Sequence, residues 1–325
     1  MKSLVTGGAG FIGSHLVDAL LKLGHEVTVL DNFSTGRPEN LDHVKGKVEI
    51  IECDLSLSGE WMKQLEKKDW VFHLAALADI VPSIQKPEAY FRSNVDGTFN
   101  MLQACALAGV KRFVYSASSS CYGIPDKYPT AEVAEIRPQY PYAMTKRIGE
   151  ELVMHWAQVY NFPAISLRFF NVYGTRSRTS GTYGAVLGVF LAQKIAQKAF
   201  TVVGDGTQTR DFTYVTDVAE ALISAAQSER FGKIYNVGSG QTISINRLTE
   251  LLGGEKIHIP KRPGEPDCTF ADIQRITDDL GWSPKITIEE GVLKVLKNID
   301  YWRNAPVWNP ESIATATHDW FKYLG

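Results

Sequence analysis

Ten residues near the start of the chain, LVTGGAGFIG from Leu4 to Gly13, contain four glycines between two apolar stretches. Glycine loses more conformational freedom on folding than any other residue, so such a cluster indicates positions where a β-carbon does not fit. The preceding Ser3–Thr6 is short, apolar and partly β-branched, as in a buried parallel strand. Apolar residues then recur at helical spacing as far as Gly24, which we expect to cap a helix. The cluster therefore predicts a tight turn between a strand and a helix.

The glycines are spaced Gly7-x-x-Gly10-x-x-Gly13, and a second strand, Glu26–Leu30, follows the predicted helix and ends at Asp31. Together these segments form a βαβ unit of about thirty residues. The first glycine makes the turn, the second admits a pyrophosphate close to the backbone, and the third lets the helix pack against the strand. The helix N-terminus presents free N–H groups and a positive dipole end to phosphates. We therefore predict a dinucleotide site rather than a structural glycine turn.

Asp31 indicates which dinucleotide binds. An acid at the end of the second strand can hold both ribose hydroxyls of the adenosine half, and it repels the 2′-phosphate of NADP, so NAD is favoured. Arg37 lies nearby in the sequence and weakens this preference. Asp54 is placed to meet the adenine edge, and the small pair Ala75–Ala76 lets the backbone come close to the cofactor.

Short apolar segments alternate with helical patterns through the first half of the chain. Further strands are predicted at Val48–Ile51, Trp70–Leu74, Lys111–Ser116 and Pro163–Arg168, and a helix from about Pro87 to Ala108. This alternation predicts an α/β fold with a doubly wound parallel sheet, in which ligands bind at the carboxyl ends of the strands.

The pattern changes after about residue 171. Loops lengthen, residues 204–217 form a polar, hairpin-like stretch, and regular α/β structure returns briefly at Ile234–Val237. We expect residues 1–171 with about 210–240 to form the dinucleotide-binding domain, and about 172–209 with 241–325 to form a smaller, interwoven substrate domain. Near the end, Asn309 and Pro310 predict the start of a helix. Its apolar face packs on its own domain or meets a partner.

Composition excludes several classes of partner. The 325 residues carry a formal net charge of −2, which gives no electrostatic case for nucleic acid or for an anionic membrane surface. No stretch approaches the roughly 18 apolar residues of a membrane helix, and the first residues do not resemble a signal peptide. The four cysteines and seven histidines are scattered. We therefore expect free thiols, no metal site and a cytoplasmic protein.

Tyr142 and Lys146, in the segment YPYAMTK, lie four residues apart and face the same way on a helix. A free tyrosine titrates near pH 10, whereas general acid–base catalysis favours a pKa near neutrality. A lysine ammonium and a positive nicotinamide ring can together lower that pKa. The pattern alone is typical of many surface helices. Here it follows a strand and a serine run, in which Ser118 can hydrogen-bond the same substrate oxygen as Tyr142.

Six motifs appear in a fixed order along the chain: G-x-x-G-x-x-G, DNFSTG, HLAA, SSSCYG, YAMTK and FFNVYG. In these motifs the sequence resembles the nucleotide-sugar epimerase/dehydratase family of extended short-chain dehydrogenases/reductases, over nearly its whole length. The resemblance implies a Rossmann domain with tightly held NAD and a small C-terminal domain over the sugar nucleotide. It also implies a UDP-sugar as the substrate and a homodimer.

By matched position, the resemblance implies a catalytic triad of Ser118, Tyr142 and Lys146. With the residue pattern, it assigns cofactor binding to Tyr142 and Lys146 and to Gly7, Gly10, Phe11, Ile12, Gly13, Asp31, Asn32, Asp54, Leu55, Leu74, Ala75, Ala76 and Asn94. It assigns substrate binding to Ser118, Asn171, Arg210, Arg262, Glu265 and Thr269. Two arginines also suit a diphosphate on chemical grounds, because a planar guanidinium pairs bidentately with phosphate oxygens.

The residues after Ser118 limit the reaction. Dehydratases and decarboxylases of the family carry an acid or amide before the YG pair, whereas this chain has Ser119-Ser120-Cys121. Related 3,5-epimerases use a cysteine one position earlier, so we expect Cys121 to be a packing residue. What remains is 4-epimerization. Tyr142 takes the proton of the sugar 4-hydroxyl, hydride moves from C4 to NAD, and hydride returns to the other face of the 4-keto sugar.

The sugar is predicted less directly. Thr269, seven residues after Arg262, is small, and in the family this position partly decides whether a C2 acetamido group fits. We therefore expect UDP-N-acetylhexosamine or UDP-hexose. Arg176 and Arg178 either meet the carboxylate of a UDP-uronate or are solvated loop charges. The remaining alternatives are a 4,6-dehydratase, decarboxylase or reductase of the same family, and a non-catalytic NAD-binding regulatory protein.

Overall fold

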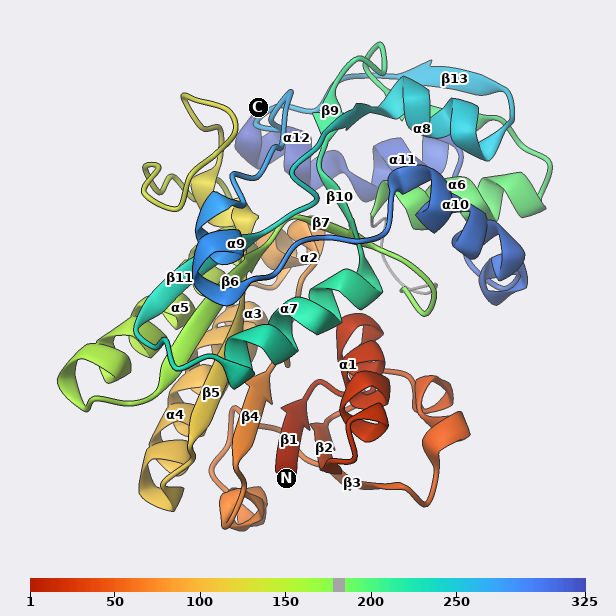
Figure 1. The fold of residues 1–325 in the computed structure, drawn as a ribbon. Helices are drawn as coiled ribbons and strands as arrows, with labels where there is room; N and C mark the ends of the chain where they lie inside the picture. The colour runs from red at the N-terminus through yellow and green to blue at the C-terminus, as the bar shows by residue number, and fades with distance from the viewer. Residues whose placement is uncertain (178–184) are drawn as a thin grey trace.

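The computed structural model describes residues 1–177 and 185–325. At its centre is a seven-stranded parallel sheet with the order β11-β6-β5-β4-β1-β2-β3 (Figure 1). The strands are β1 Lys2–Thr6, β2 Glu26–Asp31, β3 Val48–Glu52, β4 Trp70–His73, β5 Arg112–Ser118, β6 Ala164–Phe169 and β11 Lys233–Val237. The order reverses between β1 and β4, where doubly wound sheets bind ligands. The predicted α/β fold is confirmed.

Alternate residues of the strands face two layers of helices. Val5 and Phe72 lie in one core cluster together with residues of α1 (Phe11–Lys22) and α7 (Val215–Gln227). Their neighbours Leu4 and Val71 lie in a second cluster with residues of α4 (Gly97–Ala108) and α5 (Pro141–Val159). Because helices cover both faces of the central part of the sheet, the central strands are largely apolar along their length, and their composition predicts them. The edge strand β3 is half-buried or exposed at every position and carries two glutamates.

The predicted helix from Pro87 to Ala108 contains a change of winding. It begins as α3 (Pro87–Phe91), passes through a π-helical stretch, Arg92–Asp96, and continues as α4. Such π-helical turns occur frequently at functional sites. This one carries Asn94.

The other described elements form a smaller assembly at the carboxyl ends of the main strands, in the upper part of Figure 1. It contains three two-stranded sheets: β7 (Asn171–Tyr173) with β10 (Phe212–Tyr214), β9 (Thr209–Arg210) with β12 (Ile243–Ser244), and β8 (Phe200–Val203) with β13 (Lys256–Ile259). Its own core cluster includes residues of α6 (Val186–Ile195), α8 (Ile245–Leu252) and α10 (Ile288–Lys297).

The predicted hairpin over residues 204–217 is wrong. Its two short strands, β9 and β10, do not pair with each other, because β9 pairs with β12 and β10 pairs with β7. The last residues of the stretch, from Val215, begin α7. Strands of two or three residues are defined by partners elsewhere in the chain, and a local pattern does not reveal those partners.

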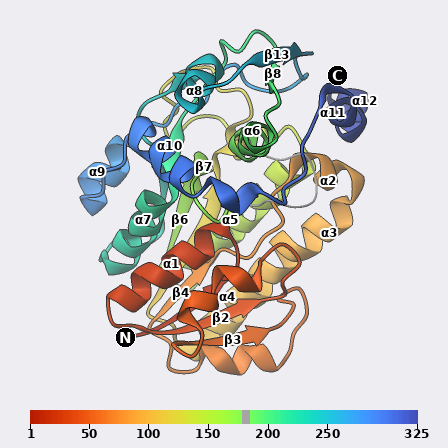
Figure 2. The ribbon, with the colours of Figure 1, turned by 90° about the vertical axis from the view of Figure 1, so that its right-hand side faces the viewer.

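The C-terminal segment forms two short helices, α11 (Pro310–Ala316) and α12 (His318–Leu324). Asn309 caps α11 as predicted, since its side chain accepts the N–H of Ser312 at 2.8 Å. The predicted single apolar face is interrupted at Thr317, where the chain turns from α11 into α12. In Figure 2, α12 lies beside α2 (Ile80–Gln85) of the first half of the chain. The segment therefore packs on the rest of the same chain.

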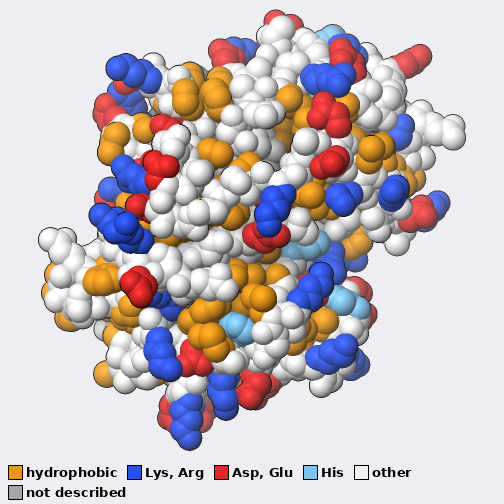
Figure 3. Space-filling model, viewed as in Figure 1, with side chains coloured by type: hydrophobic (Ala, Val, Ile, Leu, Met, Phe, Trp, Pro, Cys, Tyr) orange, Lys and Arg blue, Asp and Glu red, His pale blue; other side chains and the backbone are white. Residues whose placement is uncertain are grey.

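Charge is distributed evenly on the face shown in Figure 3, where Lys and Arg are interspersed with Asp and Glu. Such a face lacks the single-sign patch that nucleic acid requires. Within residues 1–177 and 185–325, no helix combines the length and apolar character needed to cross a membrane. The same residues contain no group of three or more His, Cys, Asp or Glu side chains placed to hold a metal ion.

Candidate active site

One large cleft crosses the carboxyl ends of the main strands and is lined by both halves of the chain. The predicted site residues that line it are Gly7, Gly10, Phe11, Ile12, Gly13, Asp31, Asn32, Asp54, Leu55, Leu74, Ala75, Ala76, Ser118, Tyr142, Asn171, Arg210, Arg262, Glu265 and Thr269. Lys146 and Asn94 do not line it. They are buried, with 4% and 1% of their surface exposed, and support it from behind.

The glycine turn leaves no room for side chains. A β-carbon on Gly13 would lie 2.1 Å from the carbonyl oxygen of Gly7. Gly7 itself has a φ of +67°, and a β-carbon there would lie 2.8 Å from the backbone nitrogen of Ala75. Gly10 is the N-cap of α1 and offers no side chain to the first N–H groups of the helix. These groups face the cleft, so the turn fits the pyrophosphate of a dinucleotide such as NAD.

Asp31 lies at the end of β2 with both carboxylate oxygens in use. They accept the backbone N–H groups of Ala9 and Phe33, each at 2.9 Å. Burial raises the pKa of Asp31, and these two hydrogen bonds oppose the shift. Each oxygen retains a lone pair, which leaves capacity for a ribose hydroxyl. Arg37 instead lies 5.0 Å from the ring centroid of Tyr301.

Asn94 connects three segments behind the cleft. Its side-chain amide donates to the carbonyl of Leu77 at 2.9 Å and to the hydroxyl of Thr145 at 3.0 Å. Its side-chain oxygen accepts the N–H of Leu77 at 2.8 Å. The π-helical stretch thus ties the segment after β4 to α5. The sequence motif located Asn94, but the change of winding that presents it has no sequence signal.

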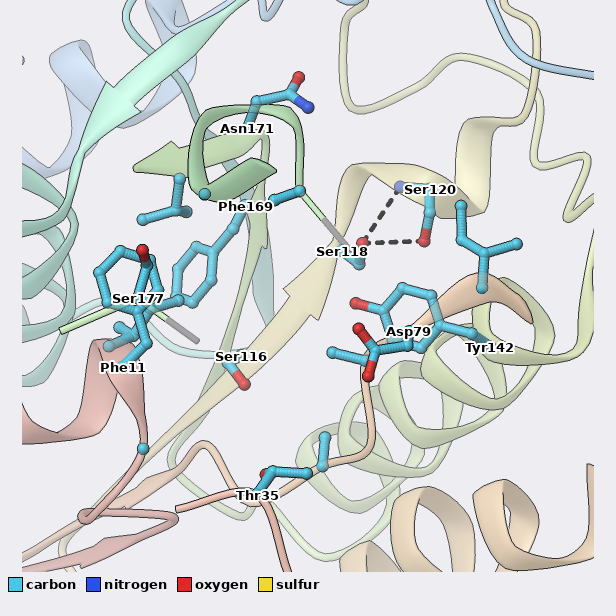
Figure 4. A pocket seen from close by; sticks show the side chains of 18 of the residues that line it. Phe11, Thr35, Asp79, Ser116, Ser118, Ser120, Tyr142, Phe169, Asn171 and Ser177 are labelled. Atoms are coloured by element: carbon cyan, nitrogen blue, oxygen red, sulfur yellow. Dashed lines mark hydrogen bonds between the residues drawn. The ribbon is translucent and has the colours of Figure 1, made fainter. Parts of the chain in front are cut away.

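Ser118 and Tyr142 come together from β5 and α5. Ser118 is the last residue of β5, and its Oγ lies 2.8 Å from Oγ of Ser120 and accepts the Ser120 N–H at 3.2 Å (Figure 4). Tyr142 lies in the first turn of α5. Burial raises the pKa of the Tyr142 hydroxyl, while its hydrogen bond with Ser118 opposes the shift. A serine and a tyrosine hydroxyl thus face the same part of the cleft.

Lys146 lies one helical turn beyond Tyr142, and its Nζ is 4.5 Å from the centroid of the Tyr115 ring. Burial lowers the pKa of Lys146 to about 7, and the charge of Glu150 opposes this shift. We predicted a lowered pKa for Tyr142 from the ammonium and the nicotinamide ring acting together. In the chain without cofactor the pKa of Tyr142 is raised, because the desolvation of the phenolate outweighs the other interactions, so the lowering stays a prediction for the NAD complex.

A buried ion pair beneath this site was missed by the sequence analysis. Glu150 accepts three hydrogen bonds from Arg168, at 2.6, 2.9 and 3.2 Å, and one from Ser166 at 2.9 Å. The guanidinium of Arg168 also lies 4.8 Å from the ring centroid of Tyr122 and donates to its hydroxyl. The sequence did contain a signal for this ion pair: Arg168 is a charged residue inside the largely apolar strand β6, and a buried charge requires a partner.

The predicted substrate residues lie together on the opposite wall. Glu265 lies between two arginines, 2.7 Å from Nη2 of Arg210 and 3.6 Å from Nη1 of Arg262. Thr269 donates its hydroxyl to the side-chain oxygen of Asn171 at 2.7 Å. This wall thus joins residues from β7, from β9 and from the 260–269 loop, and it carries two guanidinium groups for an anion.

The other residues that line the cleft include Asp79, Tyr140 and Trp320, to which the sequence analysis gave no role. Asp79 precedes α2, and its negative charge raises the pKa of Tyr142 (Figure 4).

Cys121 does not line the cleft. It is 2% exposed and packs in a small apolar cluster, and burial raises its pKa to about 12, which confirms its prediction as a packing residue.

Comparison with known proteins agrees with this geometry. The model of a family described as the NAD dependent epimerase/dehydratase family matches residues 3–238. The UDP-glucose 4-epimerase of Mycolicibacterium smegmatis is 35% identical over 319 residues, or 94% of this chain and 99% of that protein.

Solved structures give the same result. A UDP-N-acetylglucosamine 4-epimerase from Methanobrevibacter ruminantium, in complex with UDP-N-acetylmuramic acid, has a TM-score of 0.87 at 34% identity, over 93% of this chain and 97% of that one. A UDP-glucuronic acid 4-epimerase from Bacillus cereus, in complex with UDP-glucuronic acid and NAD, has a TM-score of 0.84 at 31% identity, over 94% and 99%. The chain belongs to the NAD dependent epimerase/dehydratase family.

Proposed function

We propose that this protein is an NAD-dependent 4-epimerase of a UDP-hexose or UDP-N-acetylhexosamine. The observation that carries the proposal is the meeting of Ser118 and Tyr142 in a cleft with a dinucleotide turn on one side and two arginines on the other. The 4-epimerases among its relatives support the same reaction. A non-catalytic NAD-binding protein would have no need of this pair.

In the proposed mechanism, NAD would supply the acceptance of hydride from the sugar C4 and its return to the opposite face. The glycine turn and Asp31 hold the cofactor, and Ala75 and Ala76 allow its close approach. Tyr142, as its phenolate, takes the proton of the 4-hydroxyl and later returns it, while Ser118 orients the same oxygen. The positive charges of Lys146 and of the nicotinamide ring of bound NAD would together favour that phenolate. Lys146 supplies a supporting positive charge from one helical turn away. Each residue returns to its starting protonation state, as an epimerization requires.

The segment after Ser118 argues against elimination and decarboxylation. Residues Ser119–Tyr122 form a 3-10 turn with hydroxyl groups and one buried thiol. Because burial raises the pKa of Cys121 to about 12, that thiol is no acid or base at neutral pH. The turn offers no carboxyl group, so the position at which dehydratases of the family carry their acid supplies none here.

We expect the cleft to favour a neutral sugar over a uronate. Arg176 lines the cleft and its Nη2 pairs with Asp18 at 2.8 Å, while its Nη1 is buried with no hydrogen-bond partner among the described residues; Arg178 lies outside them. Asp79 lies in the same cleft, and its negative charge raises the pKa of the Tyr142 hydroxyl. A second carboxylate on the sugar would meet this like charge, which we expect to select against UDP-glucuronate.

Replacing Asp79 by asparagine therefore raises kcat/KM for UDP-glucuronate relative to UDP-glucose by about tenfold or more, because the like-charge repulsion disappears. The ratio is measured from initial rates on both substrates. Asp126→Asn serves as the control, since Asp126 is an exposed aspartate paired with Arg137. An unchanged ratio in Asp79→Asn would contradict this role of Asp79.

The reaction itself is tested by an NMR time course with purified protein and no added cofactor. UDP-GlcNAc, UDP-glucose and UDP-glucuronate are supplied separately. We expect the C4 epimer of a neutral sugar to appear without net production of reduced cofactor. The proposal is wrong if protein that carries NAD converts no sugar nucleotide with a 4-hydroxyl group, whether the nucleotide is UDP or another.

We also propose a homodimer formed through α4 and α5. Phe99 on α4 is 37% exposed and meets Trp156 of α5 edge to face at 5.7 Å. Met144 and Val159 extend the exposed apolar surface along α5. Phe99→Glu is expected to convert the dimer to monomer in light scattering, because it places a charge within the interface. Phe231→Glu, at another exposed phenylalanine, should leave the dimer intact. A dimeric Phe99→Glu protein would exclude this surface.

Two coarser assignments accompany this proposal. We assign NAD binding to residues 1–171 with about 210–240, because they contain the glycine turn. We assign UDP-sugar binding to about 172–209 with 241–325, because they contain Arg262, Glu265 and Thr269, to which Asn171 and Arg210 contribute from the boundary between the two. We place the protein in the cytoplasm, because all four cysteines are free thiols, as is usual in a reducing compartment.

A further inference from the structure

Trp320, on the last helix of the chain, contacts the arginine wall of the cleft. It is 5% exposed, and the centroid of its indole ring lies 5.3 Å from the guanidinium carbon of Arg262. Its Nε1 donates to the carbonyl of Pro263 at 2.7 Å. One side chain therefore holds both the charged end of Arg262 and the backbone next to it.

The same indole lies near the catalytic side of the cleft. Its ring centroid is 6.4 Å from that of Tyr140, and Tyr140 stacks in turn on Tyr142 at 6.4 Å with an interplanar angle of 10°. Trp320 thus contacts Arg262 on one side and, on the other, Tyr140, which stacks on the residue proposed to take the proton.

The helix α12 is held from the other side as well. Asp319 accepts a hydrogen bond from the side chain of Gln85, at the end of α2, at 2.7 Å. Figure 2 shows α12 beside α2 at the edge of the molecule. The helix therefore connects the first half of the chain to the loop that carries Arg262.

Arg262 requires such support. It lies on the 260–268 loop, which has no helix and no strand of its own. An arginine on a loop of this kind samples many orientations, and fixing it on binding costs affinity. A guanidinium held over an indole face and paired with a carboxylate, as Arg262 is with Trp320 and Glu265, loses much of its orientational freedom before substrate binds.

We propose that Trp320 is a positioning residue for substrate: it preorganises Arg262 and the adjoining backbone, so that the C-terminal helix forms part of the UDP-sugar site. The inference rests on the proposed function, because it assigns a diphosphate to the two arginines. It predicts an effect on substrate binding that exceeds the effect on the chemical step.

The test compares Trp320→Ala and Trp320→Phe with the wild type, all loaded with NAD. Binding of UDP alone is measured by calorimetry, and KM and kcat are measured on the best UDP-sugar. Trp320→Ala is expected to weaken UDP binding and to raise KM by about tenfold, with kcat changed less than about threefold. Trp320→Phe keeps a ring on Arg262 and should recover most of the UDP affinity. The control is Phe321→Ala, the exposed neighbour on the same helix.

A double variant separates positioning from general stability. In the background of Arg262→Met, Trp320→Ala should weaken UDP binding little further, because the group it positions is absent. An equal loss in both backgrounds overturns the inference, as does unchanged UDP binding in Trp320→Ala. Failure of the wild type to bind UDP overturns the proposed substrate instead, so the two failures are distinguishable.

Discussion

Tyr142→Phe lowers kcat for the 4-epimerization by about 10²–10⁴-fold while the protein still folds and retains NAD. The substitution removes only the hydroxyl that hydrogen-bonds with Ser118. The ring keeps its contacts with Tyr90 and Tyr140, at 6.5 and 6.4 Å between centroids. Without the hydroxyl, no group at the end of β5 accepts the 4-hydroxyl proton with comparable basicity.

The rate is measured by the NMR time course, and the cofactor content by absorbance of the denatured protein. Tyr160→Phe is the matched control, because Tyr160 follows α5 and is 61% exposed. Ser118→Ala should reduce kcat less than Tyr142→Phe does, since Ser118 orients the oxygen but does not carry the proton. A Tyr142→Phe enzyme within tenfold of the wild type would show that another group moves the proton.

The parts of the fold that could be predicted are those fixed by local rules. The glycine turn is determined by steric exclusion between residues a few positions apart, as the contact of Gly13 with Gly7 shows. The central strands of the main sheet are largely apolar on both faces, so their composition alone reveals them. Tyr142 and Lys146 are related by helical spacing. Each of these signals is contained within about ten residues of sequence.

The parts that could not be predicted depend on partners distant in sequence. The short strand β9 exists because β12 pairs with it, and Trp320 matters because the loop of Arg262 folds against it. The raised pKa of Tyr142 depends on how deeply surrounding segments bury the hydroxyl. No spacing rule contains this information, and burial is a property of the assembled chain.

Glu150→Gln is expected to reduce the free energy of unfolding by about 3–5 kcal/mol, the largest loss we predict for a single substitution. Glu150 and Arg168 have side chains only 1% and 2% exposed. Removing the negative charge leaves the guanidinium of Arg168 buried without a counter-charge, which is more costly than losing the hydrogen bonds alone. The loss is measured from urea unfolding and from Tm.

The neighbouring Glu151 provides the matched control. It also pairs with an arginine, Arg147, at 2.9 Å, but its side chain is 58% exposed. Glu151→Gln should change stability by no more than about 0.5 kcal/mol, since water screens an exposed pair. If both glutamines destabilise equally, burial of the Glu150 charge is not the cause.

The two partners of the buried pair should not be equivalent. In Arg168→Met, Glu150 still has Nη1 of Arg147 at 2.9 Å and the hydroxyl of Ser166, so part of its charge remains compensated. Arg168 has no second carboxylate among its hydrogen-bond partners, which are Tyr122 and the carbonyl of Glu132. Glu150→Gln should therefore destabilise more than Arg168→Met.

The double variant Glu150→Leu/Arg168→Met should lose less than the sum of its two single substitutions, because neither charge is left alone. Additive losses would mean that the two charges do not stabilise the fold as a pair.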